Sequence, residues 1–147
     1  MNRVKKDDLL HPELSYQILG ILFEVSNTLG YGYLEKYYQK GIAALLKKSN
    51  VSFKEQVKVE VIIGDEVVAH GFADFIIEDK IILEIKKGDS FRKYNIDQLF
   101  SYLKMTGLQL GILANFTSKG LLHKRILNIP NYAKSISTAI NTTQNNS

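Results

Sequence analysis

Two stretches of this chain decide its fold: Gly71-Phe72-Ala73-Asp74-Phe75-Ile76-Ile77 and Lys80-Ile81-Ile82-Leu83-Glu84-Ile85-Lys86. Both are apolar and rich in isoleucine, which predicts β-strands. The polar break between them is short enough for a hairpin loop. A hairpin closed symmetrically about Asp79 places Ile76 opposite Ile82. The same register places Asp74 opposite Glu84, so the predicted unit is an antiparallel hairpin with a carboxylate on each strand.

The predicted hairpin gathers charges of a kind that suit phosphodiester hydrolysis. Directly opposed side chains have Cβ atoms roughly 5 Å apart, and like charges there are destabilising. Lys86 lies on the same face as Glu84, because side chains alternate along a strand. A divalent cation would relieve the repulsion between the two carboxylates. The alternative is that Glu84 and Lys86 form the wet face of a half-exposed strand, since Glu-x-Lys alone is a very weak motif.

Composition narrows the chemistry that such a site can use. The chain has no cysteine, which excludes disulfides, thiolate zinc sites, iron–sulfur clusters and cysteine nucleophiles. Its three histidines lie far apart in the sequence. Any metal would therefore be held mainly by oxygen ligands, which favours Mg²⁺ or Mn²⁺ over zinc. The apolar fraction of 45% is ordinary for a soluble globular protein.

The charge balance permits a nucleic-acid partner without requiring one. The formal net charge is +4, and basic residues gather in the second half of the chain. The candidates for phosphate contacts are Lys87, Arg92, Lys93, Lys124 and Arg125. An ordinary solvated surface also explains any one of these basic residues taken alone. No apolar signal-peptide core follows the N-terminus and no apolar run has the length of a membrane span, so we expect a cytoplasmic protein with no membrane partner.

The remaining patterns predict an α/β fold. Helical spacing of apolar residues predicts helices over residues 13–29, 34–48 and 91–106, with Ser90 or Asp89 as the cap of the third. Strands are predicted over residues 53–63, 67–77, 80–86, 108–116 and 123–129. A strand–helix–strand unit beside antiparallel hairpins implies a central mixed sheet flanked by helices. We expect a single domain over residues 1–130 and a polar, disordered tail over residues 131–147.

Three further features bear on the site. Glu35 heads an apolar helix face, where it either complements the helix dipole or points at a ligand. Gln98 shares a face of the third helix with Asn95 and Tyr102, and this face can point back toward the hairpin. We expect three other tyrosines to belong to the core rather than to an interface: Tyr31, Tyr33 and Tyr37.

Several of these residues stand in an order that resembles a known family. Gly32-Tyr33-Leu34-Glu35-Lys36-Tyr37-Tyr38 is similar to the motif that names the GxxExxY proteins, small members of the PD-(D/E)xK nuclease-like superfamily. The resemblance runs from about Leu14 to Arg125. It includes the Asp74 strand, Glu84-Ile85-Lys86, Gln98-Leu99 with Tyr102-Leu103, and the strand that ends in Asn115-Phe116.

The resemblance implies a restriction-endonuclease-like fold and a metal-dependent nuclease, with DNA as the expected substrate. By its pattern, Asp74 and Glu84 are metal ligands, the Ile85 carbonyl and Glu35 complete the metal shell, and Lys86 orients or activates water. Gln98 matches the polar residue that follows the Glu-x-Lys strand. Ala73 stands where the superfamily's name has proline, a departure that removes no ligand.

Two other functions remain open on the same fold. The first is a non-catalytic nucleic-acid-binding module, and the second is a protein-interaction module whose acidic cluster is a solvated patch. The complete set of Glu35, Asp74, Glu84 and Lys86 favours catalysis over both. A chain of 147 residues leaves little room for a separate recognition domain. Specificity is therefore expected to come from a homodimer or a partner protein.

Overall fold

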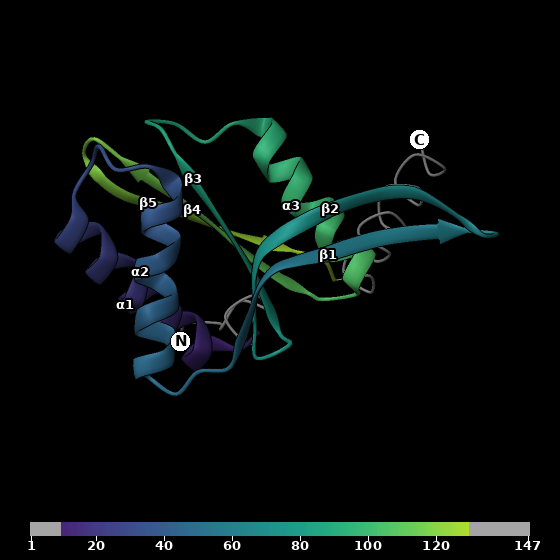
Figure 1. Cartoon of the computed structure of the whole chain (residues 1–147), viewed down its shortest axis with the longest axis horizontal. Coiled ribbons are helices and arrows are strands. Elements are labelled where there is room, and N and C mark those ends of the chain that lie inside the picture. The colour runs from purple at the N-terminus through teal and green to yellow at the C-terminus, as the bar shows by residue number, and fades with distance from the viewer. Residues whose placement is uncertain (1–9, 130–147) are drawn as a thin grey trace, which may run out of the picture.

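The computed structural model describes residues 10–129 (Figure 1). It contains α1 (Pro12–Leu29), α2 (Glu35–Lys48), β1 (Phe53–Ile63), β2 (Glu66–Ile77), β3 (Ile81–Lys87), α3 (Lys93–Thr106), β4 (Leu110–Thr117) and β5 (Gly120–Leu127). This order matches the predicted one. The polar tail predicted for residues 131–147 lies outside the described residues, as do the first nine residues of the predicted domain.

The five strands form one mixed sheet in the order β1-β2-β3-β4-β5. Three neighbouring pairs are antiparallel, and β3 pairs in parallel with β4, with α3 as the crossover between them. Ile76 lies opposite Ile82, so the predicted hairpin register is confirmed. The loop keeps Glu78 and Asp79 in left-handed conformations, with φ of 55° and 53°, which lets a three-residue connection close the hairpin.

Each face of the sheet carries its own core. Helices α1 and α2 cover one face, and α3 covers the other (Figure 1). Along β3 the side chains alternate between the two: Leu83 and Ile85 face α1 and α2, whereas Ile82 faces α3. By the same alternation, Glu84 and Lys86 lie on the α3 face.

The start of α3 differs from the prediction. The helix begins at Lys93, and Arg92 is its N-cap residue without a side-chain cap. Asp89, a predicted cap, instead accepts hydrogen bonds from the backbone N–H and the hydroxyl of Ser118, both at 2.9 Å. These bonds lower the pKa of Asp89. Asp89 therefore ties the loop after β3 to the turn after β4 instead of capping the helix.

Strand β2 pairs with β3 only through its last three residues, Phe75 to Ile77. The pairing between the two strands ends at Phe75 and Leu83, whereas β2 stays paired with β1 to the tip of their hairpin. Beyond this point β1 and β2 form a two-stranded arm that projects from the sheet (Figure 1). We call the point of separation, at Asp74 and Glu84, the fork. The arm exposes five apolar side chains: Ile62, Ile63, Val67, Val68 and Phe72.

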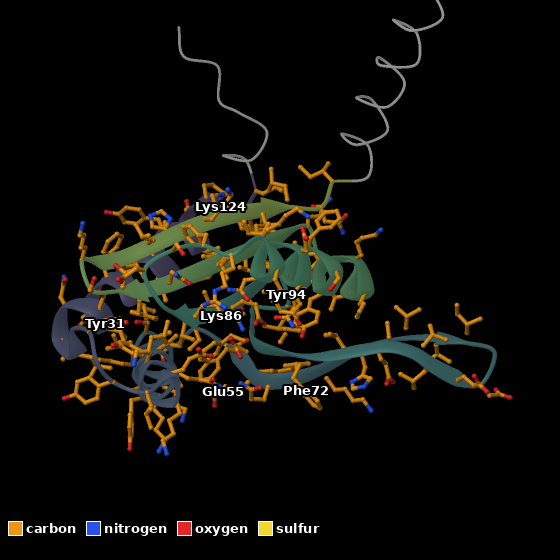
Figure 2. The ribbon with its side chains drawn as sticks, turned by 90° about the horizontal axis from the view of Figure 1, so that it is seen from above. Tyr31, Glu55, Phe72, Lys86, Tyr94 and Lys124 are labelled. Atoms are coloured by element: carbon orange, nitrogen blue, oxygen red, sulfur yellow. The ribbon has the colours of Figure 1, made fainter. Side chains whose placement is uncertain are left out.

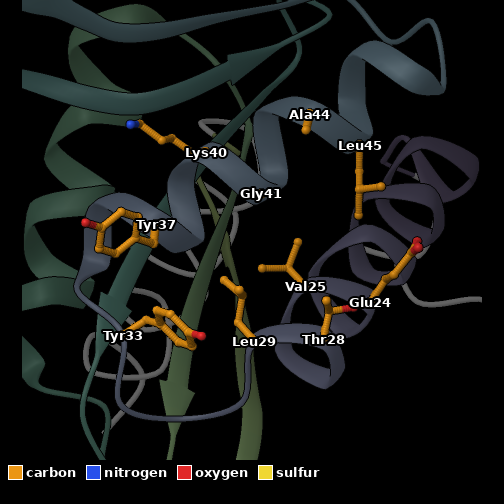
Figure 3. Close-up of a pocket in the computed structure, with 10 residues that line it drawn as sticks. All are labelled: Glu24, Val25, Thr28, Leu29, Tyr33, Tyr37, Lys40, Gly41, Ala44 and Leu45. Carbon is orange, nitrogen blue, oxygen red and sulfur yellow. The ribbon is translucent and has the colours of Figure 1, made fainter.

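The prediction that three tyrosines belong to the core is wrong. Tyr31, Tyr33 and Tyr37 are 49%, 47% and 41% exposed. The core position is taken instead by Tyr38, which stacks on Phe116 with ring centroids 4.3 Å apart. Tyr33 and Tyr37 stand at one end of a cavity of about 500 Å³ between α1 and α2 (Figure 3). None of the described helices is long and apolar enough to cross a membrane.

Helix α3 packs onto the sheet through a glycine contact near the fork. A Cβ atom built on Gly71 of β2 would collide with the ring of Tyr102. The absence of a side chain at residue 71 therefore lets Tyr102 lie directly against the backbone of the arm. This contact fixes the distance between α3 and β2 beside the two carboxylates.

Two glycine substitutions test this contact. Gly71→Ala should lower the free energy of unfolding by about 1–3 kcal/mol, because the Tyr102 ring must move. Gly20→Ala should raise it by about 0.5–1 kcal/mol, because Gly20 is an exposed helical glycine with nothing within 4 Å of the added atom. Urea unfolding followed by circular dichroism measures both. Equal stability of the Gly71→Ala variant and the wild type would contradict the close approach of Tyr102.

Candidate active site

The two carboxylates at the fork bind each other's strands. The backbone N–H of Asp74 donates to Glu84 Oε1 at 2.8 Å, and the backbone N–H of Ile85 donates to Asp74 Oδ2 at 2.9 Å. Backbone pairing between β2 and β3 has ended here, so side-chain oxygens satisfy N–H groups that the separating strands leave behind. The predicted opposition of Asp74 and Glu84 is therefore present, with the side chains crossing between the strands.

Glu84 is a buried carboxyl group beside a second carboxylate. Its side chain is only 3% exposed. Burial is the largest cause that raises its pKa to about 8, and the charge of Asp74 raises it further. The hydrogen bond from the Asp74 backbone and the charge of Lys86 oppose this shift without cancelling it. Near neutral pH, the protein alone therefore holds a proton on Glu84.

Glu35 and Lys86 belong to the same electrostatic cluster, although they come from opposite layers. Glu35 is the first residue of α2 and is exposed as a whole. Its carboxylate is nevertheless partly surrounded by protein, and this desolvation raises the pKa of Glu35. Lys86 lowers this pKa and Asp74 raises it. The structure thus brings together all four charged residues that the sequence singled out: Glu35, Asp74, Glu84 and Lys86.

The donor set of this cluster fits a divalent cation. Within residues 10–129, no group of three histidine, cysteine, aspartate or glutamate side chains is arranged to hold a metal ion as it stands. Asp74 and Glu84 each already accept a backbone hydrogen bond at the fork. Their mutual repulsion, visible in the raised pKa of Glu84, is nevertheless what a bound cation would compensate. Hard carboxylate oxygens are also the ligands that Mg²⁺ and Mn²⁺ prefer.

Gln56 is a site residue that the sequence analysis missed. Its amide nitrogen donates to Asp74 Oδ1 at 3.2 Å and to Gln39 Oε1 of α2 at 3.1 Å. Gln56 lies within β1 with a φ of 47°, a left-handed conformation that is rare for a residue other than glycine. This strained conformation marks a local irregularity of the strand opposite Asp74. A lone glutamine in a strand gives no signal of such a contact in the sequence.

Helix α3 places Tyr102 next to the fork. Burial raises the pKa of Tyr102, and the charge of Glu84 raises it further, while a backbone hydrogen bond with Phe72 opposes both effects. Gln98 lies one helical turn before Tyr102 and is half-buried. Its backbone carbonyl accepts a hydrogen bond from the Ser101 hydroxyl. Of the α3 face that was predicted to point toward the hairpin, Tyr102 is therefore the residue that reaches the fork.

The loop after Lys86 is held by a buried amide. Asn115 lies opposite Lys86 on β4 and is 1% exposed. Its amide nitrogen donates to the carbonyls of Gly88 and Ser90, at 2.8 and 3.0 Å. These two hydrogen bonds therefore fix the loop between Lys86 and the start of α3. Among the motif residues, Asn115 thus has a structural role.

The five predicted phosphate contacts do not form one surface. Lys87, Arg92 and Lys93 follow the fork on β3 and at the start of α3, and Lys93 pairs with Asp97 at 2.9 Å. Lys124 lies in the same row as Glu84 two strands away, roughly 10 Å across the sheet. Arg125 points to the opposite face, where its guanidinium donates to the Leu10 carbonyl at 3.2 Å. The structure thus does not bring Arg125 to the fork.

Comparisons with known proteins support the fold. Residues 12–126 match the PD-(D/E)XK nuclease superfamily. The chain is similar to the crystal structure of SSO0001, with a TM-score of 0.52 and 24% identity over 90% of this chain and 67% of that one. It also resembles an alkaline exonuclease from Laribacter hongkongensis, with a TM-score of 0.46 and 11% identity over 87% of this chain and 89% of that one, a likeness too weak to bear on function. No curated protein matches the chain.

The match of residues 12–126 to the PD-(D/E)XK nuclease superfamily confirms the restriction-endonuclease-like fold that the resemblance implied. The mixed five-stranded sheet flanked by helices is the predicted arrangement. The motif strands β2 and β3 lie inside the matched residues, and so does the fork.

The raised pKa of Glu84 predicts how stability depends on pH. Between about pH 4.5 and 8, native Glu84 keeps a proton that the unfolded chain has lost, so the free energy of unfolding of the metal-free protein should fall as pH rises. The limiting slope for one such group is about 1.4 kcal/mol per pH unit. Glu84→Gln should remove most of this slope, leaving the smaller contribution of Glu35, which has the same sign.

Urea unfolding at several pH values in EDTA measures this slope. Glu66→Gln is the matched control, because Glu66 is an exposed carboxylate in the arm. It should keep the wild-type slope. Parallel pH profiles of the wild type and Glu84→Gln would show that Glu84 ionises normally in the native protein.

Proposed function

Because the chain belongs to the PD-(D/E)XK nuclease superfamily, we propose that it is a metal-dependent nuclease that hydrolyses phosphodiester bonds in nucleic acid, with DNA as the expected substrate. The observation that carries this proposal is the carboxylate pair at the fork. Asp74 and Glu84 contact each other's strands, and Lys86 lies on the same face. This combination supplies two carboxylate ligands and the Lys86 ammonium at one point of the fold.

Asp74 and Glu84 would hold one Mg²⁺ or Mn²⁺, together with the carbonyl of Ile85 and with Glu35 directly or through water. When bound, the ion lowers the pKa of a water molecule and neutralises charge on the scissile phosphate. The protein's own part begins with Glu84, which must release its proton to become a ligand. Loading should therefore become easier as pH rises toward about 8.

The residues around the pair have separate tasks. Lys86 would position the attacking water and balance the charge of the carboxylates as Glu84 ionises. Gln56 would keep Asp74 oriented through its amide, with Gln39 holding that amide from α2. Gln98 would contact substrate or water from α3, next to Tyr102 on the same helix.

We also propose that the chain belongs to the GxxExxY branch of the superfamily. Each motif residue has a distinct structural part that supports this. Gly32 has a φ of 115° at the turn into α2, Glu35 joins the charge cluster, and Tyr38 stacks on Phe116. The hydroxyl of Tyr38 also donates to the carbonyl of Gly30, which fixes the loop that delivers Glu35.

The activity is tested by cleavage of plasmid DNA, single-stranded DNA and RNA with Mg²⁺ or Mn²⁺. We expect metal-dependent cutting that EDTA abolishes. Asp74→Asn and Glu84→Gln should reduce it below detection, because each removes a charged ligand, whereas Glu66→Gln in the arm should cut normally. Cutting that survives in the Asp74→Asn, Glu84→Gln double variant would overturn the assignment of the site. No cutting by any protein on any substrate would favour a binding module.

Lys86→Ala separates chemistry from metal binding. The variant should bind Mn²⁺ with about the wild-type affinity, because Lys86 is not a ligand. Its single-turnover cleavage rate should fall on the order of a hundredfold or more, as expected for a group that positions or activates the nucleophile. Calorimetric Mn²⁺ titration and single-turnover kinetics measure the two quantities. A parallel loss of both would make Lys86 a structural part of the metal site instead.

Gln56→Gly tests the orienting amide. Glycine adopts a φ of 47° without strain, so the free energy of unfolding should stay level or rise, by up to about 1 kcal/mol. The cleavage rate and the Mn²⁺ affinity should both fall, because Asp74 loses its side-chain partner. Gln39→Ala, which removes only the outer bond, should have a smaller effect. Unchanged affinity in Gln56→Gly would rule out a positioning role.

A further inference from the structure

Exposed aromatic rings flank the fork on two sides. Tyr31 lies in the loop before α2 and is 49% exposed. Tyr94 lies in the first turn of α3 and is 71% exposed. In the view of Figure 2, Lys86 lies between the two tyrosines. Tyr31 leaves about half of its surface in water and Tyr94 leaves more than half, so neither ring is used up by the core.

We propose that this site takes a single-stranded nucleic acid, with unpaired bases stacking on Tyr31 and Tyr94 on either side of the carboxylate pair. The inference rests on the proposed nuclease function, and it adds the class of substrate. DNA and RNA share the chemistry that it uses, namely a flexible phosphate backbone and free base faces.

Tyr31 contacts a lysine that adjoins the site. The ammonium of Lys87 lies 5.4 Å from the centroid of the Tyr31 ring, and Lys87 directly follows Lys86 on β3. The ring and the charge are therefore presented together at the end of the strand that carries Glu84. An aromatic face for a base beside an ammonium for its phosphate is the combination found in single-strand binding grooves.

Tyr94 is tied to the site from the other side. It lies in the first turn of α3, about two helical turns before Tyr102, whose ring lies against Gly71 beside the fork. Arg92 and Lys93 precede it and are exposed. The start of α3 thus repeats the pattern of the Tyr31 loop, with an exposed ring next to basic side chains.

The two rings favour a single strand over a duplex. In a duplex each base face is covered by its neighbours, so a protein ring meets only base edges and backbone. A single strand offers every base face for stacking, without regard to sequence. The arm does not provide an alternative path for phosphates, because beyond the fork it carries three carboxylates, Glu60, Asp65 and Glu66, against the single lysine Lys58.

Binding in EDTA tests the proposal apart from cleavage. Fluorescence anisotropy would follow labelled single-stranded DNA, single-stranded RNA and the matching DNA duplex, each of about 20 nucleotides, at fixed salt. We expect the wild type to bind at least one single strand roughly tenfold or more tightly than the duplex. Tyr31→Ala and Tyr94→Ala should each weaken that binding roughly tenfold, which is one lost stacking contact.

Two matched variants serve as controls. Tyr31→Phe keeps the ring and should stay within about twofold of the wild type. Tyr16→Ala removes a tyrosine that is 82% exposed at the start of α1, away from the fork, and should bind normally. Circular dichroism and urea unfolding would establish that each variant is folded.

The outcomes separate the two proposals. Single-strand binding that needs both rings supports the substrate class even if no nucleic acid is cut, in which case the nuclease function fails alone. Equal affinity for single strand and duplex, or wild-type binding by Tyr31→Ala and Tyr94→Ala, would overturn the substrate class even if cleavage is observed. A preference for DNA or for RNA among single strands would identify the source of the strand.

Discussion

The separation of β2 from β3 at Asp74 is the constraint on which the rest of the site depends. Where the two strands part, their backbone groups lose each other as partners. The Asp74 and Glu84 carboxylates take over the exposed N–H groups, each reaching to the opposite strand. The same separation opens the sheet between its two layers. Side chains from both faces, including Glu35 of α2 and Tyr102 of α3, therefore act on one pair of carboxylates.

Ionisation of Glu84 at the fork is electrostatically unfavourable, and packing elsewhere in the fold offsets it. Glu84 is buried on β3 just past its last pair with β2, beside the charge of Asp74, and both effects disfavour its ionised form. Such an arrangement costs stability whenever Glu84 is charged without a compensating cation. Packing and hydrogen bonds next to Glu84 offset this loss of stability. Ile82 and Leu83 are fully buried in the two cores, and Asn115 fixes the loop that leaves β3.

Much of this site was predictable from local sequence. The short polar loop fixed the hairpin register, so the opposition of Asp74 and Glu84 followed from counting residues about Asp79. The period of two placed Lys86 on the face of Glu84. Gln56, by contrast, was not predictable. Its contact with Asp74 depends on the pairing of β1 with β2 and on a left-handed residue within a strand, and neither has a sequence signature.

The sequence by itself determined the order of elements, the hairpin and the charged residues of the fork, because turn length and side-chain alternation act over a few residues. Only the tertiary structure decided where β2 leaves β3, that Tyr31 and Tyr37 stay in water while Tyr38 enters the core, and that Arg125 binds the Leu10 carbonyl on the far face. These outcomes depend on packing between segments distant in the chain. An aromatic or basic residue reads the same in the sequence whether a neighbour covers it or solvent does.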